Sequence, residues 1–277
     1  MKVALIVCGR LENRYAIEFI EHYKQLGFDH IYIADNNRDN EEHFEDVLQQ
    51  YIDDQFVTIY DYRYVKSGVQ YAASIEIYKK ISNDYDWVAF FDFDEFLTLV
   101  EDQSIKDYLS RDCFIDANQI LINWKIYTDN DLVYDDGGGC LERFTTPLKQ
   151  NKNCITDNNY YDNTLCKAII KTHVDNINYF DCHICKNDLL DNSTYNNKGD
   201  KVINTVSTQP INYDLAYIKH FKTKTIDEWI NNKLIRGTGD RNIYHFKNTY
   251  PFLSFFRYNK MTKEKHEYIK NYIKNNK

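Results

Sequence analysis

Apolar and polar positions follow two different periods along the first hundred residues, and these periods predict a regular succession of strands and helices. Short apolar runs, typical of buried strands, occupy residues 3–8, 30–34 and 56–60. Apolar residues at helical spacing follow each run, over residues 15–26, 41–51 and 68–81. A fourth strand comes next, so the βαβαβαβ order predicts a mostly parallel sheet with right-handed crossovers.

The fourth strand ends in a cluster of acidic residues. Residues 87–97 read WVAFFDFDEFL, in which five apolar residues lead directly into Asp92, Asp94 and Glu95. Ligands of open α/β sheets bind beyond the carboxyl ends of the strands, where these side chains would stand. Carboxylates held close together repel one another, and a divalent cation relieves that repulsion while leaving positions for phosphate oxygens. The pattern favours a metal-bound diphosphate, although acidic residues at a helix N-terminus would also produce it.

The second half of the chain is less regular. Strand-like runs occupy residues 119–125, 165–174 and 215–221, and a helix is predicted over residues 225–234. Three consecutive glycines lie in a polar loop over residues 129–139, and residues 175–213 show no periodicity and are expected to form loops. No internal repeat and no convincing linker interrupts the chain, which favours one domain with inserted loops.

Composition and charge exclude several classes of protein. The formal charge of -8 and the lack of a basic stripe outside the Lys-rich C-terminus argue against a nucleic-acid partner. No Gly-rich phosphate loop follows the first strand, which disfavours a dinucleotide or Walker-type site. The chain shows neither a cleavable signal nor a transmembrane run, so we expect a cytoplasmic protein with seven reduced cysteines. Residues 182–185 form a CxxC motif, but zinc is disfavoured because a second close pair is missing.

A series of motifs occurs in the order found in glycosyltransferase family 92 and the family-2-like bacterial sugar transferases. The series comprises Glu12-Asn13-Arg14, LGFDHIYIADNN at residues 26–37, Gln70-Tyr71, the DFDEF block, Trp124 in INWKIY, Glu142-Arg143-Phe144, KAIIKTHV at residues 167–174, the IKHF block and Arg236-Gly237. The chain therefore resembles these sugar transferases over residues 2–240.

The resemblance implies a GT-A fold, which is a Rossmann-like α/β fold with a mostly parallel central sheet flanked by helices and an irregular acceptor-side second half. It implies one catalytic domain over residues 1–240, with a nucleotide-sugar-binding half (1–118), an acceptor-side half (119–240) and a C-terminal helical tail (241–277). Within the tail, an apolar stripe along a Lys-rich helix would either pack on the domain or contact anionic lipid. Peripheral attachment to the cytoplasmic face of a membrane would suit a lipid-linked acceptor.

The same resemblance assigns roles to individual residues. Asp92 matches the first carboxylate of the family's DxD motif, which faces the donor ribose or sugar, and Asp94 matches the carboxylate that binds the metal, Mn²⁺ or Mg²⁺. His220 matches a late histidine that would be the second protein ligand of this metal. Asp35 and Gln70 take positions beside the nucleoside of a nucleotide-sugar donor, with a UDP-sugar favoured. Such a metal would neutralise the charge that develops on the leaving nucleoside diphosphate.

The catalytic base stays open between three residues. An inverting transferase needs a carboxylate that accepts the proton of the acceptor hydroxyl, and Asp129, Asp131 and Glu142 all follow the strand that contains Trp124. The predicted function is a metal-dependent, inverting transfer of a sugar to a glycan or lipid-linked glycan. Two alternatives compete with it. One is a haloacid dehalogenase-type phosphatase that uses the Asp92/Asp94 pair, and the other is a non-catalytic nucleotide-sugar-binding module.

Overall fold

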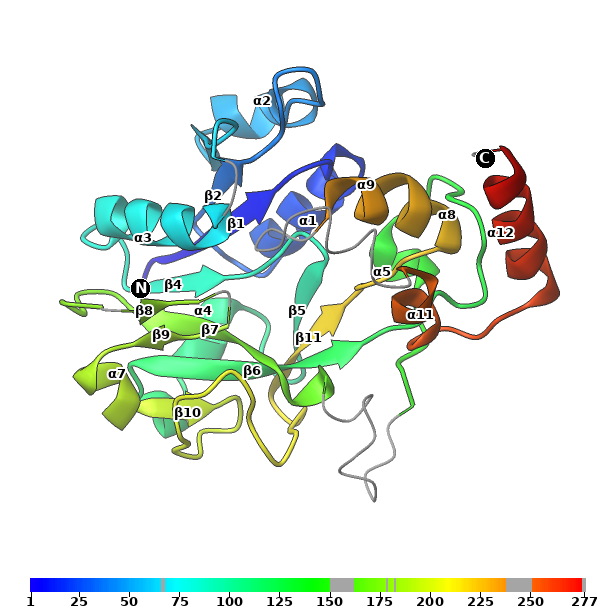
Figure 1. Ribbon diagram of the computed structural model, residues 1–277. Helices are drawn as coiled ribbons and strands as arrows, with labels where there is room; N and C mark the ends of the chain where they lie inside the picture. Colours follow the sequence, from blue (N-terminus) through cyan, green and yellow to red (C-terminus); the bar gives the residue numbers. More distant parts are fainter. Residues whose placement is uncertain (66–67, 150–161, 178, 182, 238–250, 276–277) are drawn as a thin grey trace.

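The computed structural model describes residues 1–65, 68–149, 162–177, 179–181, 183–237 and 251–275 (Figure 1). Strands and helices alternate in the N-terminal half as the sequence predicts. The strands are β1 (Val3–Gly9), β2 (His30–Asp35), β3 (Val57–Asp61) and β4 (Trp87–Phe90). The helices are α1 (Asn13–Gln25), α2 (Glu45–Asp53) and α3 (Val69–Ile81). The helical period and the short apolar runs therefore located each of these seven elements.

The second half contains more regular structure than its sequence pattern indicates. Its strands are β5 (Glu95–Leu99), β6 (Gln119–Ile126), β7 (Cys166–Lys171), β8 (Tyr179–Phe180), β9 (Cys185–Lys186), β10 (Thr194–Asn196) and β11 (Ala216–His220). Its helices are α4 (Ile105–Leu109), η1 (Asp112–Phe114), α5 (Cys140–Arg143), α7 (Asp188–Asn192), α8 (Ile226–Glu228), the π-helical turn η2 (Trp229–Lys233), α9 (Leu234–Arg236), α11 (Pro251–Phe256) and α12 (Lys263–Asn275).

One expectation about this half was wrong, and one strand was not predicted. The loop expected over residues 175–213 contains β8, β9, α7 and β10, which are too short to show a period. The strand that was not predicted is β5, which begins at Glu95 directly after the two aspartates. Strand β5 forms by pairing with the distant β11, and local sequence contains no signal for such a partner.

Nine strands of the described chain form one sheet in the order β3-β2-β1-β4-β7-β6-β11-β5, with β10 beside β6. The β3-β2-β1-β4 part is parallel, whereas β7 runs antiparallel to both of its neighbours, β4 and β6. Strand β11 is parallel to β6 and antiparallel to β5. The sheet is therefore mostly parallel, as predicted. Strands β4, β6 and β11 run in the same direction, so their carboxyl ends lie at the same edge of the sheet.

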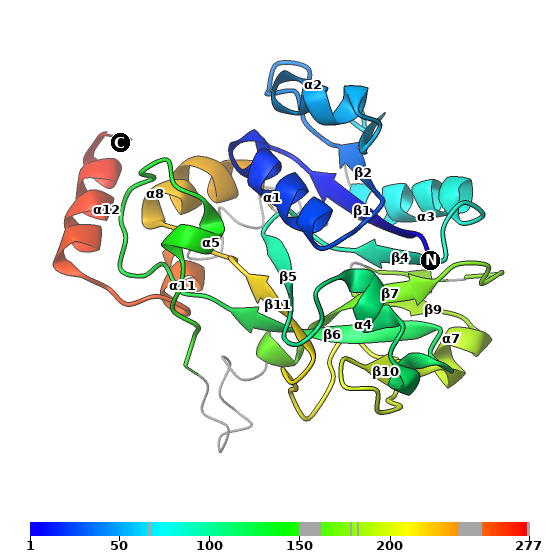
Figure 2. The same ribbon diagram turned by 180° about the vertical axis from the view of Figure 1, so that it is seen from behind.

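Side chains of β1 alternate between two apolar layers. Val3, Leu5 and Val7 pack with α1 on one face, and Ala4 and Ile6 pack with α3 on the other. Figure 1 shows α3 in front of these strands, and the reverse view of Figure 2 shows α1 in front. Both faces of the strand are buried, which explains why its sequence reads as a continuous apolar run.

A close contact beneath the acidic residues joins them to β1. The ring of Phe93, between Asp92 and Asp94, stacks on Phe44 with 5.2 Å between ring centroids. Both rings lie over Gly9 at the end of β1, where an added Cβ would stand 2.5 Å from Phe93 and 2.7 Å from Phe44. The absence of a side chain at Gly9 therefore sets the position of the turn that contains both aspartates.

The C-terminal helices pack against the segment that follows β11. Trp229, Ile230 and Phe255 form the centre of a separate apolar cluster, and Tyr268, Ile269 and Tyr272 of α12 pack on it. Both views place α12 beside α8 and α11 (Figures 1 and 2). The apolar stripe predicted on this helix is thus partly covered by protein. The predicted domain boundary at residue 240 lies outside the described residues, and no described helix is long and apolar enough to cross a bilayer.

We expect Gly9→Ala to lower the free energy of unfolding by about 2 kcal/mol, because the new methyl group overpacks the contact with Phe93 and Phe44. Urea denaturation followed by circular dichroism measures this loss. The double variant Gly9→Ala/Phe93→Leu should regain part of the lost stability, since leucine lacks the ring atoms that the new methyl group would meet. A stability of Gly9→Ala equal to that of the native chain would contradict the close approach.

Candidate functional site

Strand directions bring four segments to one edge of the sheet. The carboxyl ends of β4 and β11 lie there, together with the amino ends of β5 and β7. These ends supply Asp92 and Asp94 after β4, Glu95 at the start of β5, Lys167 in β7 and His220 at the end of β11. Chain segments far apart in sequence therefore meet at the edge where α/β sheets bind ligands.

Three side chains at this edge lie close enough together to hold a cation. One ligand atom from each of Asp94, Glu95 and His220 lies within 4.8 Å of the other two. Glu95 and His220 are paired across β5 and β11, and His220 Nε2 lies 3.6 Å from Asp94 Oδ1. All three residues are buried, with exposed fractions of 4%, 0% and 5%. Strand pairing, together with the turn after Phe93, holds the cluster in place.

Burial and neighbouring charges shift the pKa values of all three residues of the cluster. Burial by itself would raise the pKa of the Asp94 carboxyl, but the Lys233 ammonium and His220 hold that pKa well below its usual range. Burial raises the pKa of Glu95 well above its ordinary value, and Lys167 opposes only part of this rise. Burial lowers the pKa of His220, which keeps the imidazole neutral and able to act as a metal ligand.

Asp92 is held from two sides. Gln70 Nε2 on α3 donates to Asp92 Oδ1 at 2.5 Å, and Lys167 Nζ donates to Asp92 Oδ2 at 2.8 Å. Lys167 Nζ also lies 3.4 Å from Glu95 Oε2, so one ammonium bridges two carboxylates. The Gln70 and Asp92 positions that the sequence related to the donor are therefore in direct contact.

Aromatic and imidazole rings border the cluster on the β6 side. The ring of Trp124 lies 4.2 Å from His220 and 5.1 Å from His183, measured between centroids. His183 is further fixed by a hydrogen bond between Nδ1 and the Cys166 carbonyl oxygen, 2.7 Å apart. Cys182, which would complete the CxxC motif, and Cys154 lie outside the described residues.

Asp35 lies at the carboxyl end of β2, and its carboxylate is fully engaged. Oδ1 accepts hydrogen bonds from the backbone and side-chain nitrogens of Asn37, and Oδ2 accepts from Arg63 at 2.5 and 2.9 Å. The residue is completely buried. In this arrangement Asp35 orients Arg63 and the Asn36-Asn37 turn, and its predicted contact with a nucleoside stays a prediction.

The three predicted base residues lie after β6 in different surroundings. Asp129 is buried and forms a 2.5 Å ion pair with Lys265 of α12. Asp131 is 59% exposed and lies 3.4 Å from the same lysine, and Glu142 is exposed on α5. The structure brings Asp129 and Asp131 together, and it places Glu142 on a separate element. Their role as bases stays a prediction.

Three residues of the candidate site were not assigned to it from the sequence. Glu95 was recognised as part of the acidic run but was not assigned to the metal, because its contact with His220 depends on pairing between β5 and β11. Lys167 left a signal, since it directly precedes the apolar run Ala168-Ile169-Ile170 of the same strand, and a charge buried in such a strand needs a partner. Lys233 left none, because its 3.0 Å contact with Asp94 joins residues far apart in the chain.

Comparison with known proteins identifies the family. The chain belongs to glycosyltransferase family 92, whose model matches residues 12–276. This membership confirms the family that the motifs indicated, and it favours a transferase over the phosphatase and the non-catalytic binding module. No curated protein matches the chain.

Similar solved structures include TarS from S. aureus. TarS 1-349 is 16% identical with a TM-score of 0.44, and the match covers 80% of this chain and 60% of that one. The complex of TarS 1-349 with UDP is 15% identical with a TM-score of 0.46, covering 88% and 68% respectively. The mixed α/β architecture itself, with its mostly parallel central sheet flanked by helices, is the GT-A fold class that was predicted.

We expect Asp129→Asn to lower the free energy of unfolding by about 3 kcal/mol, because it leaves the fully buried Lys265 ammonium with only the more distant and exposed Asp131 carboxylate as counter-charge. Urea denaturation measures the loss. Lys265→Met should lose a comparable amount, and the double variant should lose less than the sum of the two single changes. Additive losses would show that the two residues do not interact in solution.

Proposed function

We propose that this glycosyltransferase is metal-dependent and inverting, and that it transfers a sugar from a UDP-sugar to a hydroxyl group of a glycan or lipid-linked glycan. The observation that supports it most directly is the buried cluster of Asp94, Glu95 and His220 at the ligand-binding edge of the sheet. In a family 92 chain, a cation at this point would lie where the donor diphosphate is expected.

The chemistry of the cluster fits a divalent cation. Two carboxylates and one imidazole are a donor set that Mn²⁺ accepts, and three protein ligands leave coordination positions for phosphate oxygens. Glu95 Oε1 and His220 Nδ1 are buried and have no hydrogen-bond partner among the described residues, which is costly for polar atoms unless something else engages them. When bound, the metal would supply Lewis-acid stabilisation of the negative charge on the departing nucleoside diphosphate.

The residues around the cluster would orient the donor. Asp92 has a side chain that is 32% exposed, and Gln70 and Lys167 hold it in one position, so its carboxylate is available to a ribose or sugar hydroxyl. Arg63, held by Asp35, adds a cation near the carboxyl end of β2. A fixed carboxylate provides directional recognition of hydroxyl groups because its oxygens accept hydrogen bonds in defined directions.

Solvent exposure and ion pairing distinguish the three residues that could act as the catalytic base. Asp131 and Glu142 have exposed carboxylates, whereas Asp129 is buried and paired with a lysine. Burial raises the pKa of Asp129, a change that Lys265 opposes. A general base must reach the acceptor hydroxyl, directly or through one water molecule, so exposure favours Asp131 and Glu142 over Asp129.

We also propose a cytoplasmic location with peripheral contact to the membrane. Tyr268, Ile269 and Tyr272 pack on the apolar cluster, so an anionic surface would meet the exposed lysines of α12, among them Lys270 and Lys274. Such a contact would bring the enzyme close to a lipid-linked acceptor.

A UDP-sugar should raise the melting temperature by several degrees at about 100 times its Kd when Mn²⁺ is present, because it binds only the folded state. Chelator should abolish this shift. Asp94→Asn should reduce the shift and lower kcat about 100-fold or more, since it weakens the cation site. Differential scanning fluorimetry and a transfer assay measure these effects.

The matched control is Asp200→Asn, which neutralises an exposed aspartate in the turn after β10. It should behave like the native chain. A shift that persists in chelator and in Asp94→Asn would contradict the metal-dependent proposal, and hydrolysis of a simple phosphate ester without any nucleotide effect would contradict the transferase site.

Replacement of the catalytic base should lower kcat by about 10²- to 10⁴-fold with little change in KM, because the base acts on the acceptor proton in the transition state. Asp129→Asn, Asp131→Asn and Glu142→Gln test the three residues, and we expect this loss at Asp131 or Glu142. Product stereochemistry, read by proton NMR, tests inversion. Wild-type kcat in both Asp131→Asn and Glu142→Gln would exclude these residues as the base.

A further inference from the structure

Lys233 is the second cation that contacts the acidic cluster, and its surroundings differ from those of Lys167. Lys233 Nζ lies 3.0 Å from Asp94 Oδ2, on the side of the carboxylate opposite to His220, which approaches Oδ1. The Lys233 side chain is 20% exposed, whereas that of Lys167 is 1% exposed. Lys167 is thus enclosed between Asp92 and Glu95, whereas the side chain of Lys233 is partly accessible to solvent.

The backbone that bears Lys233 is irregular. The helix that follows β11 runs from Ile226 to Arg236, but its central turn, Trp229–Lys233, is π-helical. Such turns are rare, occur mostly as single insertions in α-helices and are frequent at functional sites. Lys233 is the last residue of this turn, so the irregularity determines the direction from which its side chain leaves the helix.

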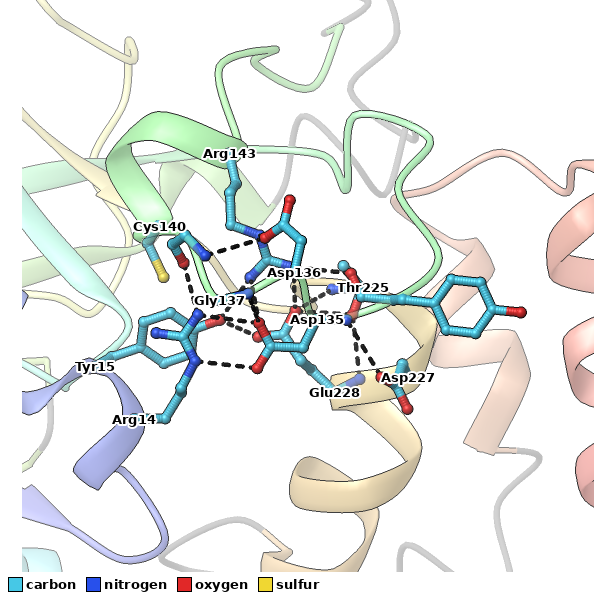
Figure 3. Close-up of polar contacts among 12 residues, drawn as sticks. Arg14, Tyr15, Asp135, Asp136, Gly137, Cys140, Arg143, Thr225, Asp227 and Glu228 are labelled. Carbon is cyan, nitrogen blue, oxygen red and sulfur yellow. Dashed lines mark hydrogen bonds and ion pairs between the residues drawn. The ribbon is translucent and has the colours of Figure 1, made fainter.

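A buried polar network fixes the start of this helix (Figure 3). Thr225 and Glu228 form a capping box, and the Glu228 carboxylate also accepts hydrogen bonds from the Tyr15 hydroxyl and from Arg143. Arg143 in turn donates to the Tyr15 hydroxyl at 2.8 Å. The network links α1, α5 and α8, so the helix is anchored at one end while the Lys233 side chain lies near its other end.

The ammonium of Lys233 competes with a divalent cation for Asp94. Both would be attracted to the same carboxylate, and two cations a few ångströms apart repel each other strongly in a partly buried site. Lysine has a flexible four-carbon stem, so its ammonium can move by several ångströms without any movement of the backbone. A diphosphate bound to the metal would offer anionic oxygens to the displaced ammonium.

We propose that Lys233 is an exchangeable counter-ion, which neutralises Asp94 in the free enzyme and moves to the donor diphosphate when metal and nucleotide bind. The inference rests on the proposed function and adds a positioning residue to it. Binding of metal and binding of nucleotide are then coupled, because metal alone must displace Lys233 without giving it a new partner. Metal together with diphosphate provides that partner.

The test measures binding instead of turnover. Mn²⁺ affinity is measured by electron paramagnetic resonance of the free ion, without and with UDP, and UDP affinity is measured by calorimetry at saturating Mn²⁺. The variants are Lys233→Met, which keeps the aliphatic stem, and Lys233→Arg, which keeps the charge. The matched control is Lys219→Met, which removes a lysine from β11 at the position next to His220.

For Lys233→Met we expect Mn²⁺ without UDP to bind about tenfold more tightly, because the competing charge is gone, and UDP to bind about tenfold more weakly. The factor by which UDP strengthens Mn²⁺ binding should shrink accordingly, since coupling between two ligands is reciprocal. Lys233→Arg should retain most of the native coupling, and Lys219→Met should match the native chain. A structural role for Lys233 would weaken both ligands together.

Unchanged or weaker Mn²⁺ binding by folded Lys233→Met would overturn the exchange, and so would unchanged UDP affinity. Failure of the proposed function gives a different result, namely that the native chain binds no UDP in the presence of Mn²⁺. In that case tighter Mn²⁺ binding by Lys233→Met still supports competition at Asp94, and unchanged Mn²⁺ binding overturns it.

Discussion

Charge balance at the end of β4 is the constraint on which the rest of the site depends. Asp92, Asp94 and Glu95 lie within one short turn, and two of them are almost completely buried. Carboxylates in such a position are unfavourable unless cations or hydrogen-bond donors surround them. Lys167 from β7 and Lys233 from η2 provide those charges. The segments that supply the two lysines must therefore pack against this edge for the acidic residues to fold.

The aromatic packing beneath the acidic residues complements this balance. Phe93 reaches down between the two aspartates to Phe44 and Gly9, so the turn is anchored from below by apolar contact. Glu95 then begins a strand that pairs with β11 and brings His220 alongside. Apolar anchoring and strand pairing together orient the polar groups, and a site built in this way is preorganised before any ligand binds.

The two cations at the site have different physical roles. Lys167 is enclosed and bridges Asp92 and Glu95, so its removal would leave the buried Glu95 carboxylate without the cation that lies 3.4 Å from it. Lys233 is partly exposed and stands at the last residue of a π-helical turn, and in the proposed exchange its flexible stem moves the ammonium to a new partner. The fold can thus combine a fixed charge that maintains the geometry with a movable charge that responds to ligands.

Much of the architecture was predictable from the sequence because it depends on local patterns. Apolar runs and helical spacing located β1 to β4 and the helices between them, and the acidic run after β4 pointed to the edge of the sheet at which the candidate site lies. The motif series also indicated the family that the comparison confirmed. The prediction was less successful for β5, β8, β9 and β10, since short strands have no measurable period and form through their partners.

The sequence by itself determined which residues could carry the chemistry, because residue type and strand order place Asp92, Asp94 and His220 at strand ends. Only the tertiary structure decided which of them meet. Pairing of β5 with β11 added Glu95 to the cluster, the antiparallel β7 brought Lys167 to Asp92, and the π-helical turn brought Lys233 to Asp94. The tertiary structure also pairs Asp129 with Lys265, which lies 136 residues later in the chain. Such contacts depend on packing between distant segments, which no local pattern records.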